Sequence, residues 1–105
     1  MAFSNEAPFQ VRKHIALLNG VNIETITGNK TLTLADSTFQ GLGGASDFDV
    51  ILPAESDGIT FWVINTGGNN LVVKDVGAAT IATVATTESA LFVCDGTQWY
   101  SVIKA

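Results

Sequence analysis

Short apolar runs, separated by turn residues at nearly even spacing, constrain the fold of this chain more than any other feature. Clusters of Gly, Asn and Asp bound each run, as Thr66–Asn69 does after the first of them. Runs rich in β-branched and aromatic residues with such boundaries are typical of strands joined by tight turns. In the second half of the chain the runs are Ile59–Asn65, Leu71–Lys74, Thr80–Thr83, Ala90–Cys94 and Trp99–Ile103.

The first half continues the pattern less regularly. The dipeptide Asn19-Gly20 is a strong hairpin signal between two candidate strands. Gly41–Ser46 is rich in glycine and is predicted to be a flexible loop, and it does not have the spacing of a phosphate-binding G-x-G-x-x-G motif. The candidate strands here are Val11–Leu18, Val21–Thr25, Thr31–Leu34, a short piece at Phe39, and Phe48–Leu52.

Nine or ten short strands with no helical periodicity predict an all-β fold. We expect an antiparallel β-sandwich or a jelly-roll-like domain. The length of 105 residues fits one domain, which we place at residues 11–105. Residues 1–10 show neither strand nor helix periodicity but contain Phe3, Pro8 and Phe9, so we expect an extended N-terminal arm.

The charge balance argues against several classes of partner. The chain has five Lys or Arg against ten Asp or Glu, a net charge of −5. Too few cations are present to neutralise a phosphate backbone, so we expect no nucleic-acid partner and no anionic membrane partner. No apolar run approaches the roughly 20 residues that cross a bilayer. The first residues do not resemble a signal peptide, so we expect synthesis in a cytoplasm.

Reactive side chains are sparse, and we expect no enzyme, no metal site and no cofactor. His14 is the single histidine, and the single Cys94 lies in an apolar run typical of a core position. The carboxylates around the middle of the chain lack the spacing of a calcium loop, and next to turns such groups usually cap backbone amides. These carboxylates are Asp47, Asp49, Glu55 and Asp57, and the turn residues Asp36, Asp75 and Asp95 have the same interpretation.

Two aromatic pairs place one ring on each face of a strand. Because side chains alternate along a strand, Phe61 and Trp62 must point in opposite directions, as must Trp99 and Tyr100. We expect Phe61 and Trp99 to point into the core. Trp62 then faces outward and becomes a candidate contact residue.

Four segments share a further pattern of strands and turns: Lys30–Ser37, Asp49–Ala54, Gly58–Asn65 and Leu91–Tyr100. Together they resemble a β domain found in structural proteins of tailed bacteriophages, and the resemblance covers about residues 30 to 103. That domain occurs in capsid decoration (cement) proteins and in tail-fibre chains.

The resemblance implies a structural virion protein that coats the outer surface of the phage head and bridges neighbouring capsomers. It implies as partners the major capsid protein and further copies of the chain, usually a homotrimer. The alternative is a tail-fibre module that binds a receptor or glycan, although 105 residues are short for a fibre. The residues expected to contact the capsid or another copy are Phe3, Pro8, Phe9, Val11, Arg12 and Trp62.

Overall fold

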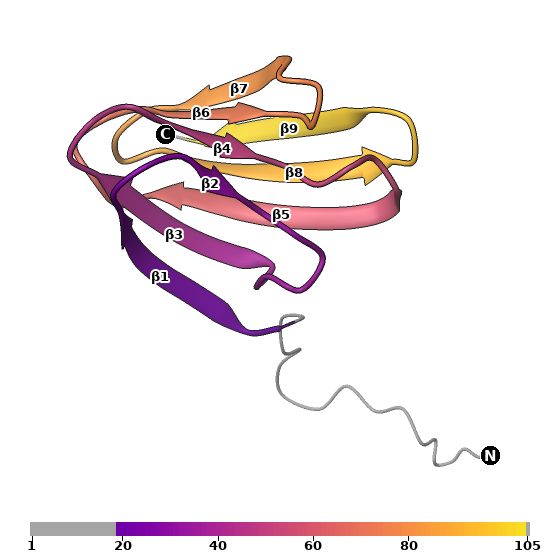
Figure 1. Ribbon diagram of the computed structural model, residues 1–105, viewed down its shortest axis with the longest axis horizontal. Helices are drawn as coiled ribbons and strands as arrows, with labels where there is room; N and C mark the ends of the chain where they lie inside the picture. The colour runs from indigo at the N-terminus through magenta and orange to yellow at the C-terminus, as the bar shows by residue number, and fades with distance from the viewer. Residues whose placement is uncertain (1–18, 105) are drawn as a thin grey trace, which may run out of the picture.

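The chain moves between two β-sheets as it passes from strand to strand (Figure 1). The computed structural model describes residues 19–104. A five-stranded sheet has the order β1-β3-β5-β8-β9, and a four-stranded sheet has the order β2-β4-β6-β7. The strands are β1 (Val21–Ile26), β2 (Lys30–Thr31), β3 (Phe39–Gly44), β4 (Phe48–Ile51), β5 (Asp57–Asn65), β6 (Leu71–Lys74), β7 (Thr80–Val84), β8 (Ser89–Asp95) and β9 (Trp99–Lys104).

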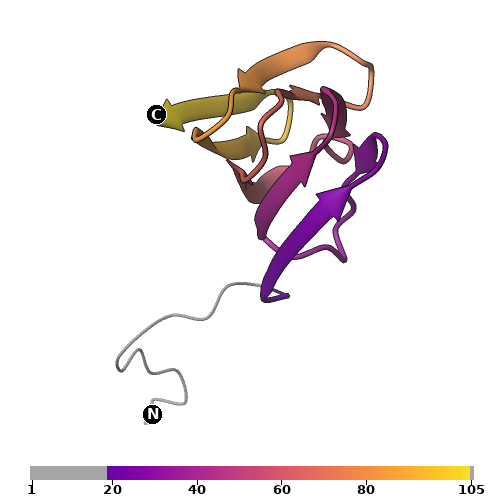
Figure 2. The same ribbon diagram turned by 90° about the vertical axis from the view of Figure 1, so that its left-hand side faces the viewer.

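The prediction of an all-β fold with two packed sheets is confirmed, but the prediction of purely antiparallel pairing is wrong. The first six strands alternate between the sheets, so neighbours within each sheet are parallel: β1 with β3, β3 with β5, β2 with β4, and β4 with β6. Only β5–β8, β6–β7 and β8–β9 are antiparallel among the described residues. The connections between successive strands from β1 to β6 therefore each take the chain across to the opposite sheet. Figure 2 shows the two sheets from the side.

Gly41–Gly44, the first part of the segment that we predicted to be a flexible loop, belongs to the strand β3. β3 lies between β1 and β5, and Gln40 to Gly43 are buried. Glycine is needed here because neighbouring groups lie where a side chain would be. A Cβ at Gly41 would lie 2.6 Å from the Ile23 Cδ1 atom, and one at Gly43 would lie 2.8 Å from the Gly67 nitrogen. Close approach of another backbone is one reason for glycine inside a strand.

The core lies between the inner faces of the two sheets. From the five-stranded sheet come Leu42, Phe61, Val63, Phe92 and other side chains, all of them buried. The four-stranded sheet and its connections contribute a matching set that includes Leu32, Val50, Leu52, Val73 and Val84. A continuous apolar layer of this kind is what stabilises a two-layer domain, since burial of each such side chain contributes about 1.5–3 kcal/mol.

Polar side chains in the turns make hydrogen bonds to the neighbouring turns of the fold. The Asn29 Oδ1 atom accepts a hydrogen bond of 2.9 Å from the Asp49 N–H, and the Asp47 Oδ1 atom accepts one of 2.8 Å from the Asn70 N–H. Asn69 donates from Nδ2 to the Gly44 carbonyl at 3.0 Å. These bonds satisfy backbone groups where the parallel strands end, which explains the Asn and Asp residues at these turns.

The positions of the other strands agree with the sequence, with one shortened element. The strand predicted at Thr31–Leu34 is limited to Lys30–Thr31, because Thr33 enters a turn in which its N–H donates to the Asp36 carboxylate at 2.7 Å. Asn19 and Gly20 both have positive φ, 58° and 77°, as a type I′ turn requires. The predicted arm 1–10 and strand Val11–Leu18 lie outside the described residues.

The contact between Gly43 and the turn after β5 leads to a first prediction. Gly43→Ala should destabilise the protein by about 1–3 kcal/mol, because the added methyl group meets the Gly67 backbone and neither strand nor turn can move freely. Gly68→Ala is the matched control, since nothing lies within 4 Å of a Cβ at that position. Urea denaturation of both variants measures the difference. Equal unfolding midpoints would contradict the close approach.

Candidate interaction surface

One row of side chains crosses all five strands of the larger sheet on the face that points away from the core. The pairing registers align these positions from β1 to β9, and every one of them is apolar. The row consists of Val21, Phe39, Trp62, Leu91 and Val102. Its two ends are the most open: Val21 is 58% exposed and Val102 is 68% exposed. Residues that match across strands interact, so this row forms one continuous apolar strip.

Two flanking rows extend the strip. On one side, Thr60, Val93 and Tyr100 align across β5, β8 and β9. On the other side the aligned residues are Ile23, Gly41, Ile64, Ser89 and Lys104. We call these three rows together the outer face. Within them Lys104 is the single charged residue.

The structure confirms the predicted orientation of both aromatic pairs. Phe61 is 3% exposed and Trp99 is 4% exposed, and both belong to the core. Trp62 is 43% exposed and lies at the centre of the outer face, and its role as a contact residue stays a prediction. The other predicted contact residues lie outside the described residues: Phe3, Pro8, Phe9, Val11 and Arg12.

Sequence reasoning identified Trp62 but missed its neighbours on the outer face. Val21 and Ile23 alternate with polar residues in β1, a pattern that favours a buried apolar side, yet they are exposed at 58% and 65%. The signal that could have found the face is present in β5 and β8. Phe61–Ile64 and Ala90–Val93 are apolar at every position, which indicates that both faces of the strand are apolar.

An acidic turn lies just beyond one corner of the outer face. The Asp95 Oδ1 atom accepts hydrogen bonds of 2.9 Å from the N–H groups of Thr97 and Gln98. The phenol of Tyr100 donates to Asp95 Oδ2 at 3.1 Å. The backbone bonds from Thr97 and Gln98 lower the pKa of Asp95, with a smaller effect from Tyr100. The bond to Asp95, and then its negative charge, raise the pKa of Tyr100.

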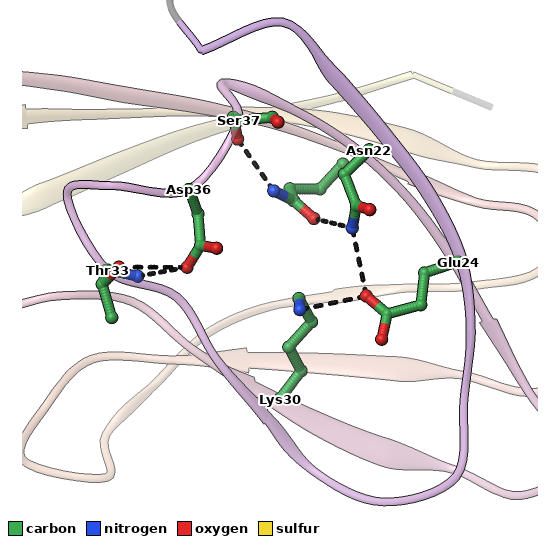
Figure 3. Close-up of polar contacts among 7 residues, drawn as sticks. Asn22, Glu24, Lys30, Thr33, Asp36 and Ser37 are labelled. Carbon is green, nitrogen blue, oxygen red and sulfur yellow. Dashed lines mark hydrogen bonds and ion pairs between the residues drawn. The ribbon is translucent and has the colours of Figure 1, made fainter.

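A polar network occupies the open end of the sandwich, between β1 and β2 (Figure 3). The Asn22 Nδ2 group donates to Gln40 Oε1 at 2.8 Å and to Glu24 Oε1 at 3.1 Å, and Lys30 pairs with Glu24 at 3.0 Å. Gln40 is buried and donates in turn to the Ser37 carbonyl at 2.8 Å. The bond from Asn22, followed by that from Lys30, lowers the pKa of Glu24. Each group has a partner, so the network joins the two sheets where apolar packing ends.

The carboxylates considered for chemistry mostly have structural partners. Asp47 caps Asn70, Asp49 pairs with Lys74 at 3.0 Å, and Asp75 accepts from the Ala79 N–H at 2.9 Å. The predicted turn roles of Asp36, Asp75 and Asp95 are confirmed. Within residues 19–104, no group of three or more His, Cys, Asp or Glu side chains is arranged to hold a metal ion.

Cys94 is buried in the core, as its sequence context predicted. A cleft of about 400 Å³ lies between Leu34 and the beginning of β5, and Asp36 and Asp57 both line it. In the part of the chain that the structure describes, no helical segment could span a membrane.

Comparisons with protein-family models, with curated proteins and with solved structures found no match. Function is therefore inferred from the geometry of the outer face and from the resemblance noted in the sequence.

The acidic turn leads to a prediction about ionisation. Tyr100 is the single tyrosine, so absorbance at alkaline pH follows its ionisation alone. We expect a pKa above the ordinary value of 10.0, because the phenolate would lose its bond to Asp95 and be repelled by the carboxylate. The stability that this contact provides is present below pH 10 and is lost as the pH rises through the raised pKa.

Two variants check the cause of that shift. Asp95→Asn should move the Tyr100 pKa back toward 10.0, since the charge is removed while the turn can still form. Asp75→Asn is the matched control, because Asp75 also accepts a bond from a residue that follows it but caps a different turn. A Tyr100 pKa that is unchanged in Asp95→Asn would contradict the described turn.

Proposed function

We propose that this chain is a structural protein of a bacteriophage virion. In this proposal it is a capsid decoration (cement) protein that binds the outer surface of the head and stabilises the shell by bridging neighbouring capsomers. Its partners are the major capsid protein and further copies of itself, and it acts by association without making or breaking covalent bonds.

The outer face is the observation that supports this proposal most strongly. The largest apolar patch on a typical soluble monomer measures about 300–600 Å² and is often functional. The apolar row of the outer face spans five strands with Trp62 at its centre, and aromatic residues are enriched in the cores of interfaces. A face of this kind is typical of a protein that works by contact with other chains.

The overall charge agrees with a position on the outside of a shell. The net charge of −5 disfavours contact with packaged DNA, whose phosphates would repel the chain. Only 14% of the residues are charged, which is low for a surface that is wholly exposed to water. Both properties are consistent with a coat protein that is partly covered by its neighbours.

The arm is proposed to supply the second contact with the capsid. Phe3 and Phe9 would offer about 1.5–3 kcal/mol each on burial. Fixing ten residues costs on the order of 10–20 kcal/mol of backbone entropy, so two rings are not sufficient. Strand addition to the major capsid protein would provide the further hydrogen bonds that this contact requires.

The exposed aromatic residues also suit the alternative function, a tail module that binds a receptor or a glycan. Trp62 and Tyr100 are on the same face, and aromatic rings of this kind stack on sugars. The cleft between Leu34 and β5 could hold such a ligand, although one of its carboxylates, Asp36, already accepts a hydrogen bond from the Thr33 N–H. The two functions differ in how many copies of the chain each virion needs.

The copy number of the chain in purified virions tests the proposal. A decoration protein should be present in numbers comparable to the major capsid protein, because it occupies sites repeated over the whole shell. Quantitative mass spectrometry, with the major capsid protein as the internal standard, measures this ratio. A handful of copies would favour the tail module, and absence from the virion would overturn both assignments.

A further inference from the structure

Charges of opposite sign lie at the two ends of the outer face, with Lys104 inside one flanking row and an acidic pair just beyond the other. Lys104 ends β9 and lies in the flanking row that includes Ser89. At the other end of the sheet, Asp57 and Asp95 lie directly opposite each other across β5 and β8. Like charges that face each other across a strand pair are destabilising, so a cation placed next to this acidic pair would reduce the repulsion.

None of these three groups has an ionic partner within residues 19–104. The two ion pairs of the described part of the chain are Lys30 with Glu24 and Lys74 with Asp49. Asp95 accepts only neutral donors, from the following turn and from Tyr100. Of the lysines at 30, 74 and 104, only Lys104 is therefore available to a second molecule.

We propose that the outer face is a self-association surface, on which two copies of the chain pack face to face about a two-fold axis perpendicular to the strands. Such an axis reverses the strand direction in the second copy. It places Lys104 of each copy over the acidic end formed by Asp57 and Asp95 in the other, with the apolar rows between them. This inference depends on the proposed function only in taking the outer face to be an interface.

Charge distinguishes this arrangement from other self-associations. An axis parallel to the strands, as in a trimer with its outer faces turned inward, would bring equal ends together. Copies of Lys104 would then cluster at one end and copies of Asp57 and Asp95 at the other. Like-charge contacts across an interface are strongly unfavourable, whereas the perpendicular axis pairs opposite charges at both ends.

The size of the face sets the strength of the association. Five strands about 4.8 Å apart, and three rows that span about 17 Å along the strands, give a plane of about 400 Å² on each copy. Two such planes bury about 800 Å² in total, which is below the roughly 1,200 Å² of stable specific interfaces and in the range of weak, transient ones. We therefore expect a dimer that dissociates on dilution and weakens with added salt.

Sedimentation equilibrium of the purified full-length chain tests the proposal without any virion. The wild type should move from monomer to dimer as its concentration rises. Lys104→Asp and Asp57→Lys should each weaken the dimer about tenfold, because each creates like-charge contacts at both ends. The double variant Lys104→Asp with Asp57→Lys should recover the dimer. Asp95 is left unchanged because it closes the turn before β9.

A pair of matched valines tests the apolar part of the contact. Val102→Asp should abolish the dimer, since Val102 is 68% exposed in the central row. Val76→Asp should have no effect, because Val76 is 60% exposed but lies in the turn between β6 and β7 of the other sheet. Circular dichroism of every variant separates loss of association from loss of folding.

The outcomes that overturn the proposal are distinct. A wild type that stays monomeric at all concentrations would overturn self-association through this face. A trimer, or a double variant that fails to recover, would overturn the two-fold arrangement. Because these measurements use the isolated protein, they do not depend on the copy number that tests the virion assignment.

Discussion

Burial of apolar side chains between the two sheets is the interaction on which the rest of the structure depends. The first six strands alternate between the sheets, so each connection between them leads to a strand that adds residues to the opposite side of the same core. Parallel strands then lie side by side within each sheet, and glycine is needed where the turn after β5 lies against β3. The apolar side chains of the core are all on the inner faces or their connections, which leaves the outer apolar row without any role in the core.

The strands were predictable from the sequence to a larger extent than their arrangement. The runs at Leu71–Lys74 and Trp99–Ile103 correspond to β6 and β9 because β-branched and aromatic residues favour extended backbone. Pairing depends on contacts between distant segments, so local turn signals at Gly28 or Thr66 could not show that the chain crosses to the other sheet. The glycines of β3 were mistaken for a loop because their reason is a close neighbour in space, which a single sequence does not display.

One residue of the candidate site was predictable from the sequence, and most of the others were not. Alternation along a strand was sufficient to place Trp62 outside once Phe61 was assigned to the core. The continuity from Val21 to Val102 depends on the pairing register of five strands and could not be read before the pairing was known. The charges of opposite sign at the ends of the face could not be recognised from the sequence either, because Asp57 and Asp95 are far apart in sequence and adjacent in the sheet.

Solvent accessibility of the outer face, compared between the dilute monomer and the assembled state, is the most direct test of the central claim that this face is covered by protein. Hydroxyl-radical footprinting read by mass spectrometry reports on Trp62 and Tyr100, with Leu34 as an exposed reference outside the face. We predict strong protection of Trp62 and Tyr100 on assembly and an unchanged Leu34. Equal modification of Trp62 and Tyr100 in both states would contradict the account.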